Sequence, residues 1–164
     1  MYRTVTAVAF RNALTHPVCN ALPSSLQQLP ERAVDDQFMA MLDAYRSSGG
    51  LARGQEVQAM LKRGGGPVVA ALAGWIASRE LICFEWQAQT WLPLFQFNRP
   101  DLTPDRRLRP VFAELSRIYD HWDVATWFTV PNPWLAQRAP VDALLGDPDA
   151  VLDAARAERF ALGG

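Results

Sequence analysis

The sequence predicts a mainly α protein with one β-hairpin, in which a helix-turn-helix-like N-terminal region with a wing is followed by a small helical C-terminal domain. Two apolar helical stripes separated by a glycine run predict the helix-turn-helix-like region. An aromatic stretch with strand periodicity predicts the wing, and short segments that begin at prolines predict the helical end. We expect an N-terminal arm over 1–34, partly mobile, the helix-turn-helix-like region over 35–99 and the helical domain over 100–164.

The composition is that of a globular protein. The chain has 164 residues, of which 49% are hydrophobic and 20% charged, enough for one compact domain or two small modules that share a core. No apolar run is long enough to span a bilayer, and the first residues lack the apolar region of a signal peptide. We therefore expect a cytoplasmic protein without a membrane partner.

Three helices are predicted before the hairpin. The first follows Asp35, which can cap it, and ends at Gly49-Gly50; its apolar stripe is Phe38, Met41, Leu42 and Tyr45. The next, in "LARGQEVQAMLKRGGG", has the stripe Val57, Met60 and Leu61. After the glycine run a helix can start at Pro67, with Leu72, Trp75 and Ile76 on its apolar face.

The stretch "LICFEWQAQTWLPLFQF" changes the period from helix to strand. Ile82, Phe84 and Trp86 alternate with less apolar neighbours, and more aromatic residues follow the polar "QAQ". This pattern predicts a β-hairpin with one aromatic face, in which Pro93 suits an edge position.

The remaining chain is predicted to be helical. One helix is expected over 109–128, with Val111, Leu115, Ile118 and Trp122 in line. Asn132-Pro133, Pro140 and Asp147-Pro148 each suit a helix start. The last helix is expected to turn Val151, Leu152, Ala155 and Phe160 inward.

The sequence holds no recognisable catalytic or metal-binding motif, so we expect neither an enzyme nor a cofactor. In "DHWD", His121 points about 100° away from Asp120 on a helix, and the interpretation is a solvated helix face.

Residues 45–79 contain five basic residues and one acidic residue, Glu56, which gives this stretch a local charge of 5 − 1 = +4. These candidates for DNA phosphate contacts are Arg46, Arg53, Lys62, Arg63 and Arg79. Residues 67–78 offer only Ser78 as a polar side chain, so a helical pair packed under the hairpin is the alternative.

The C-terminal stretch resembles the toxin-binding domain of antitoxins of the Xre/MbcA/ParS type. The resemblance covers roughly residues 80–162 and rests on the order of Trp127, Pro131-Asn132, Leu135, Arg138, Pro140, Leu144-Leu145, Asp147 and Val151, followed by "AARAERF". "FQFNRPDLTPDRRLRPVFAEL" also resembles the region that often precedes that domain. Where the family tends to place glycine, this chain has Ala136-Gln137, whose Cβ atoms resist positive φ.

The resemblance implies a partner and a site. It implies an antitoxin-like protein that binds and neutralises a cognate protein toxin, typically a RES-type enzyme that consumes NAD. It further implies a homodimer that regulates its own operon by binding operator DNA. The implied toxin-binding residues are Trp127, Pro131, Asn132, Leu135, Arg138, Pro140, Leu144 and Leu145.

Three alternatives stay open. A stand-alone DNA-binding transcriptional regulator would need no toxin. A small ligand-binding domain or enzyme would use the aromatic hairpin as a pocket wall, near Glu85, Trp86 and Trp91. The proline-started turns could also serve only to change chain direction within a core, with Trp127 and Leu144 internal.

Overall fold

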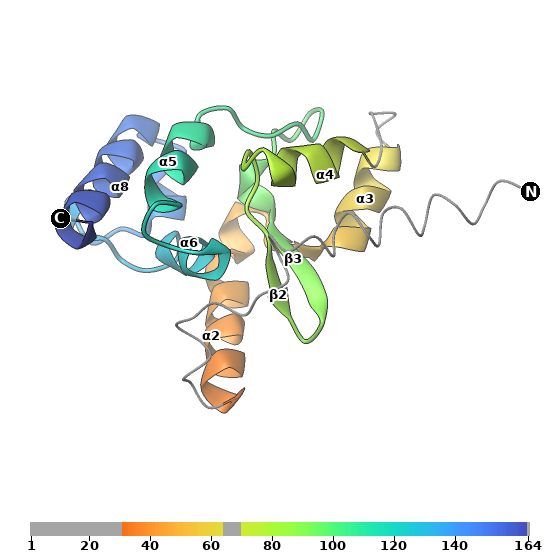
Figure 1. Ribbon diagram of the computed structural model, residues 1–164, viewed down its shortest axis with the longest axis horizontal. Helices are drawn as coiled ribbons and strands as arrows, with labels where there is room; N and C mark the ends of the chain where they lie inside the picture. The colour runs from red at the N-terminus through yellow and green to blue at the C-terminus, as the bar shows by residue number, and fades with distance from the viewer. Residues whose placement is uncertain (1–30, 64–69, 164) are drawn as a thin grey trace, which may run out of the picture.

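The computed structural model describes residues 31–63 and 70–163 (Figure 1). The first half contains α2 (Glu31–Ala44), η1 (Arg46–Ser48), β1 (Leu51–Arg53), α3 (Gly54–Arg63), α4 (Ala70–Ala77), β2 (Phe84–Trp86), β3 (Gln89–Pro93) and η2 (Leu94–Gln96). The second half contains α5 (Leu108–Leu115), α6 (His121–Trp127), η3 (Pro133–Leu135), α7 (Pro140–Ala143) and α8 (Pro148–Leu162). The arm predicted over 1–34 lies outside the described residues except for 31–34, which open α2.

The prediction of a mainly α fold with one hairpin is wrong, because the chain forms a mixed fold of helices and a three-stranded antiparallel sheet. The strand order is β1-β3-β2, so β1 adds a strand to the hairpin. In β1, Ala52 lies opposite Leu92, and the N–H of Leu94 donates to the carbonyl of Gly50 at 2.9 Å. Three residues are too few to show strand periodicity, so β1 depends on its partner strand and could not be detected locally.

The predicted hairpin is present as β2 and β3. Phe84 lies opposite Trp91, and the turn residues Gln87 and Ala88 have φ of 48° and 56°. Two positive φ values in a two-residue turn match the right-handed twist of the strands. Phe38 of α2 stacks on Trp86 with ring centroids 3.8 Å apart, so the aromatic face of the hairpin is covered by α2.

The single helix predicted over 109–128 is in fact two helices, α5 and α6. Asp120 has extended backbone angles, and its side chain accepts a hydrogen bond from the N–H of Asp123 at 3.0 Å. This N-cap starts α6 anew, because the aspartate satisfies an N–H that has no partner inside the helix.

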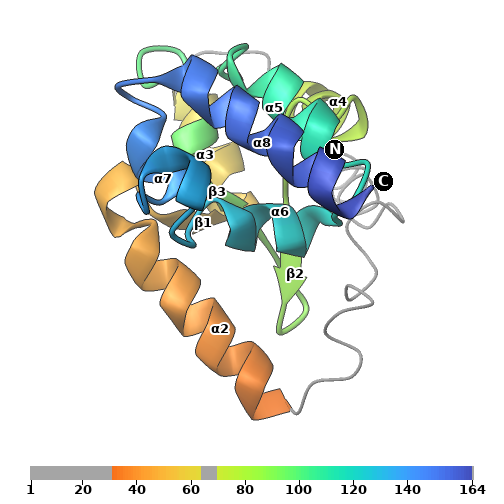
Figure 2. The same ribbon diagram turned by 90° about the vertical axis from the view of Figure 1, so that its left-hand side faces the viewer.

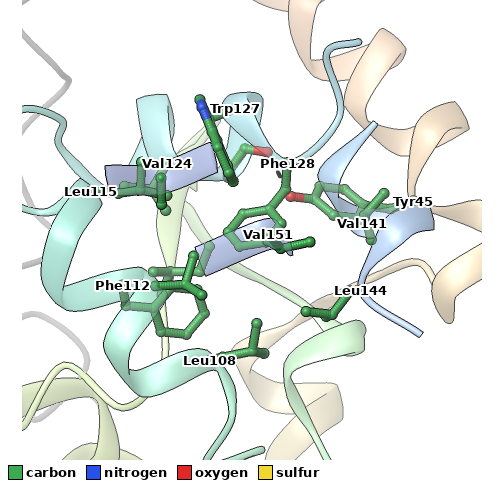
Figure 3. Packing of buried hydrophobic residues seen from close by; sticks show 14 of the residues in the cluster. Tyr45, Leu108, Phe112, Leu115, Val124, Trp127, Phe128, Val141, Leu144 and Val151 are labelled. Carbon is green, nitrogen blue, oxygen red and sulfur yellow. Dashed lines mark hydrogen bonds between the residues drawn. The ribbon is translucent and has the colours of Figure 1, made fainter. Parts of the chain in front are cut away.

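Both halves of the chain contribute to one hydrophobic core. It extends from Phe38 of α2 through α5 and α6 to Val151 of α8, and Figure 3 shows the region around Phe128. The hydroxyl of Tyr45 donates to the carbonyl of Ala125 in α6 at 2.6 Å, and the Tyr45 ring stacks on Phe95. A smaller cluster lies between α3, α4 and the sheet. The expected regions 35–99 and 100–164 therefore share a core.

Gln96 joins the hairpin to the segment before it. This side chain is fully buried; its Oε1 accepts from the N–H of Ile82 at 2.8 Å, and its Nε2 donates to the carbonyl of Ile82 at 2.9 Å. The Gln96 amide thus pairs with both the N–H and the carbonyl of Ile82, which has no strand partner. Buried backbone groups need such partners, because an unpaired one costs free energy.

Helix α8 lies beside α5 (Figure 2). Arg159 Nε lies 2.6 Å from Glu114 Oε2 across this contact, and the Tyr119 hydroxyl donates to Glu158 at 2.6 Å. The expectation that Phe160 turns inward is wrong, since its side chain is 83% exposed. It falls on the stripe of the exposed Arg156, four residues earlier, and opposite the buried Ala154-Ala155.

No helix within residues 31–63 and 70–163 combines the length and apolar character that a membrane crossing needs.

We predict that Tyr45→Phe lowers the free energy of unfolding by about 1–3 kcal/mol, because the Ala125 carbonyl loses its buried partner. Urea denaturation measures this change. Tyr119→Phe is the control: its partner Glu158 is only partly buried and water can replace the hydroxyl, so the loss should be smaller. Equal losses in both variants would contradict a special role for the bond between Tyr45, which follows α2, and α6.

Candidate protein-interaction surface

Residues 130–138, here called the Asn132 loop, form a closed turn after α6. The buried Asn132 side chain accepts from the N–H of Trp134 at 2.9 Å and so caps η3. Its own N–H donates to the carbonyl of Arg138 at 3.0 Å, and its carbonyl accepts from the N–H groups of Leu135 and Gln137, each at 3.0 Å. The residue that the sequence marked as a helix cap thus ties both ends of the loop together.

The outer side of the Asn132 loop is apolar. Trp134 is 70% exposed, and Val130, Pro131 and Pro133 are exposed around it. Leu135 instead points into the core, where η3 lies against α8. The loop is therefore anchored from below by a leucine and presents an indole to solvent.

Two residues of the loop have left-handed backbone conformations. Ala136 has φ of 55° and Gln137 has φ of 63°. A residue with a Cβ pays about 1–2 kcal/mol for this conformation, whereas glycine does not. The chain keeps the backbone shape that glycine favours, although neither residue is glycine.

The eight residues predicted to bind a toxin divide into two groups. Pro131, Arg138 and Leu145 are exposed. The others are buried and form the underside of the surface: Trp127, Asn132, Leu135, Pro140 and Leu144. Trp134 was missing from the prediction, although a one-turn helix with Pro133 first and Leu135 inward leaves its middle residue outside.

A second exposed apolar residue lies at the α7–α8 junction, residues 142–149. Leu145 is 85% exposed, while the preceding Leu144 is 4% exposed and belongs to the core (Figure 3). The N–H groups of Gly146 and Asp147 both donate to the carbonyl of Ala143, at 3.1 and 2.9 Å. These hydrogen bonds fix the backbone of the turn in a conformation that leaves the Leu145 side chain exposed to solvent.

The five residues predicted to contact DNA are all exposed. Arg46 lies 3.3 Å from Asp43, and the Arg53 guanidinium lies 5.3 Å from the centre of the Trp91 ring. Lys62 and Arg63 end α3, while Arg79 follows α4. Within residues 71–77 of α4 the exposed positions are Gly74 and Ala77, and neither side chain can form a hydrogen bond with a base edge.

The interpretation of "DHWD" as a solvated face is wrong. Trp122 is buried, Asp120 is the N-cap of α6, and His121 Nδ1 accepts from the N–H of Cys83 at 3.2 Å. Burial lowers the pKa of His121, and the positive charge of Arg79 lowers it further, whereas Asp120 opposes both. The prediction treated His121 as a residue inside one long helix. In the structure it is the first residue of α6.

A small cavity adjoins His121. Its volume is about 20 Å³, and Arg79, Ile82, Phe112 and Tyr119 contribute to its wall. One water molecule needs about 10–15 Å³ of cavity volume, so this cavity has room for one water and is too small for a substrate. Among the residues that the structure describes, no group of three or more His, Cys, Asp or Glu could hold a metal ion.

The aromatic hairpin, an alternative pocket wall, is filled by its own side chains. Trp86 stacks on Phe38, and its Nε1 donates to Asp35 at 3.0 Å. Trp91 is buried in the core, and burial raises the pKa of the neighbouring Glu85. These rings pack on one another rather than around an open space.

Comparison with protein-family models, with curated proteins and with solved structures finds no match to this chain.

We predict that Ala136→Gly raises the free energy of unfolding by about 0.5–1 kcal/mol, because glycine removes the strain of positive φ at a smaller cost in chain entropy. The matched control is Ala139→Gly, where φ is −67° and only the entropic cost applies, so this variant should be less stable than wild type. Denaturant melts of both variants give the sign. A loss of stability in both would contradict the strained loop.

We predict that His121 makes the protein less stable in mild acid. Its folded pKa is lowered, so the unfolded chain takes up the proton more readily; stability is fully present above the ordinary pKa of about 6.5 and falls as the pH drops from there toward the folded pKa. The test variant is His121→Asn, whose Oδ1 can accept the hydrogen bond from the N–H of Cys83 in place of Nδ1. Between pH 7.5 and 5.5, about one unit on either side of the ordinary histidine pKa, its melting temperature should change less than that of wild type. Equal changes in wild type and variant would refute this assignment.

Proposed function

We propose that this protein is antitoxin-like: it binds a protein toxin through the Asn132 loop and the α7–α8 junction and neutralises it by covering it. The observation that carries the proposal is the exposure of Trp134 on a loop with a closed backbone. Tryptophan and arginine dominate the binding energy of protein interfaces, and Arg138 lies in the same loop. The resemblance of residues 80–162 to toxin-binding domains points to the same segment.

The rigidity of the loop favours a binding role over a purely structural one. Asn132 fixes both ends of the turn, and the Nε of Arg138 donates to the carbonyl of Leu135 at 3.4 Å. A surface that is already ordered loses little conformational entropy when a partner docks. Backbone strain of the kind found at Ala136 and Gln137 gathers at functional positions, where the surrounding structure maintains it.

The exposure of Trp134 favours a protein partner over a small molecule. Small-molecule sites are concave and cover most of the ligand surface with apolar side chains. An indole that is 70% exposed does not line an enclosed pocket, but it can insert into a pocket on another protein.

The nature of the toxin and the DNA-binding part of the proposal come from the resemblance and from charge. The partner would be a RES-type enzyme that consumes NAD, and the antitoxin would be a homodimer. Operator DNA would be held through phosphate contacts from Arg46, Arg53, Lys62, Arg63 and Arg79, since α4 has no polar reading face. Such binding would weaken steeply with salt and discriminate little between sequences.

We predict that Trp134→Ala weakens binding of the protein encoded by the adjacent gene by roughly 30-fold or more, the effect of losing a hot-spot residue worth about 2 kcal/mol. The matched control is Met39→Ala on α2, also a large apolar side chain, 58% exposed. Co-expression, co-purification and growth rescue measure the effect, and circular dichroism checks the fold. Leu144 is unsuitable for this test because its side chain belongs to the core.

The proposal predicts rescue by wild type and by Met39→Ala, and its loss with Trp134→Ala. If wild type forms no complex at micromolar concentration, or if Trp134→Ala rescues as well as wild type, the toxin-binding proposal is wrong. Salt-dependent binding of operator-region DNA without any protein partner would then favour the stand-alone regulator.

A further inference from the structure

The α7–α8 junction lies in an acidic stretch of the sequence. Between residues 139 and 155 the sequence has four aspartates, Asp142, Asp147, Asp149 and Asp153, and no lysine, arginine or histidine. Leu145 lies in the middle of this stretch. An apolar side chain that is 85% exposed is thus flanked along the chain by negative charge alone.

Local structure accounts for part of this charge. Asp147 caps α8, since its Oδ1 accepts from the N–H of Ala150 at 2.9 Å, and Asp153 pairs with Arg156 at 3.0 Å. Asp142 and Asp149 lie in the first turns of α7 and α8, where a negative charge stabilises a helix. Within the described part of the chain, however, neither has a basic side chain at ion-pair distance, and both are exposed.

Helix stabilisation gives no reason for Leu145 to be apolar. Its neighbour Leu144 already fills the core position, and the turn is closed by backbone hydrogen bonds that any side chain would permit. An exposed apolar side chain with carboxylates on either side of it along the chain fits the usual arrangement of an interface, an apolar centre with a polar rim. The rim sets the sign of charge that the partner must carry.

We infer that the α7–α8 junction docks on a basic surface of the partner protein, with Leu145 entering an apolar pocket there and Asp142 and Asp149 facing lysine or arginine side chains around it. This inference rests on the proposed function and deepens it by giving the chemistry of the partner surface. Opposite charges at the rim mainly raise the association rate, and salt screens their contribution.

The test measures the dissociation constant of the complex with the protein encoded by the adjacent gene at several salt concentrations. The variant Asp142→Asn/Asp149→Asn removes both rim charges. The control Asp36→Asn/Asp43→Asn removes two exposed charges from α2. Thermal melts confirm that both variants fold.

The double rim variant should bind roughly five-fold more weakly than wild type at low salt, and the difference should vanish near 1 M salt, where charges are screened beyond about 3 Å. The α2 control should bind like wild type, and Leu145→Ser should weaken binding at every salt concentration. If the rim variant and the α2 control behave alike, or Leu145→Ser has no effect, this inference fails.

The two proposals can fail separately. A wild-type complex that depends on Trp134 but not on Leu145, Asp142 or Asp149 would overturn only the assignment of the α7–α8 junction. Absence of any wild-type complex would overturn both.

Discussion

The structure depends on the joining of its N-terminal and C-terminal halves in one core, fixed by the hydrogen bond from the Tyr45 hydroxyl to the Ala125 carbonyl. Tyr45 is completely buried, and burial raises the pKa of its phenol, so the side chain stays neutral and keeps its proton for this bond. Without that bond two buried polar groups would lack partners, which costs more than an ordinary hydrogen bond gains. Phe38 stacks on Trp86 and so packs α2 on β2, while Phe95 of η2 packs against Phe128 at the end of α6.

The same core supports the surface on which the proposed function rests. Leu135, Val141 and Leu144 anchor the Asn132 loop and the α7–α8 junction from beneath. The N–H of Val141 donates to the carbonyl of Phe128, so α7 is tied directly to the end of α6. Prolines start η3, α7 and α8 at fixed backbone angles, and this allows the three helices to follow one another with short connections between them. A rigid support of this kind keeps Trp134 and Leu145 exposed in a single arrangement.

The sequence predicted local features better than those that depend on distant partners. The hairpin and the caps at Asn132 and Asp147 were predictable because strand alternation and cap residues act within a few positions. Strand β1 was not, since its three residues form a strand only opposite β3. Within the candidate surface, the sequence could not separate the exposed residues from the buried ones. Leu144 and Leu145 are adjacent leucines, and only the turn between α7 and α8 decides which of them enters the core.

The measurement that tests the central claim most directly is site-specific photo-crosslinking in cells that also express the adjacent gene. A photoreactive phenylalanine would replace Trp134, Leu145 or, as the control, Met39, all of which are exposed. Crosslinks from positions 134 and 145 to one and the same partner, without a crosslink from position 39, are the result that the account predicts. Crosslinks only from position 39, or none from position 134, would contradict the account. The proline-started turns would then serve only to change chain direction within the core.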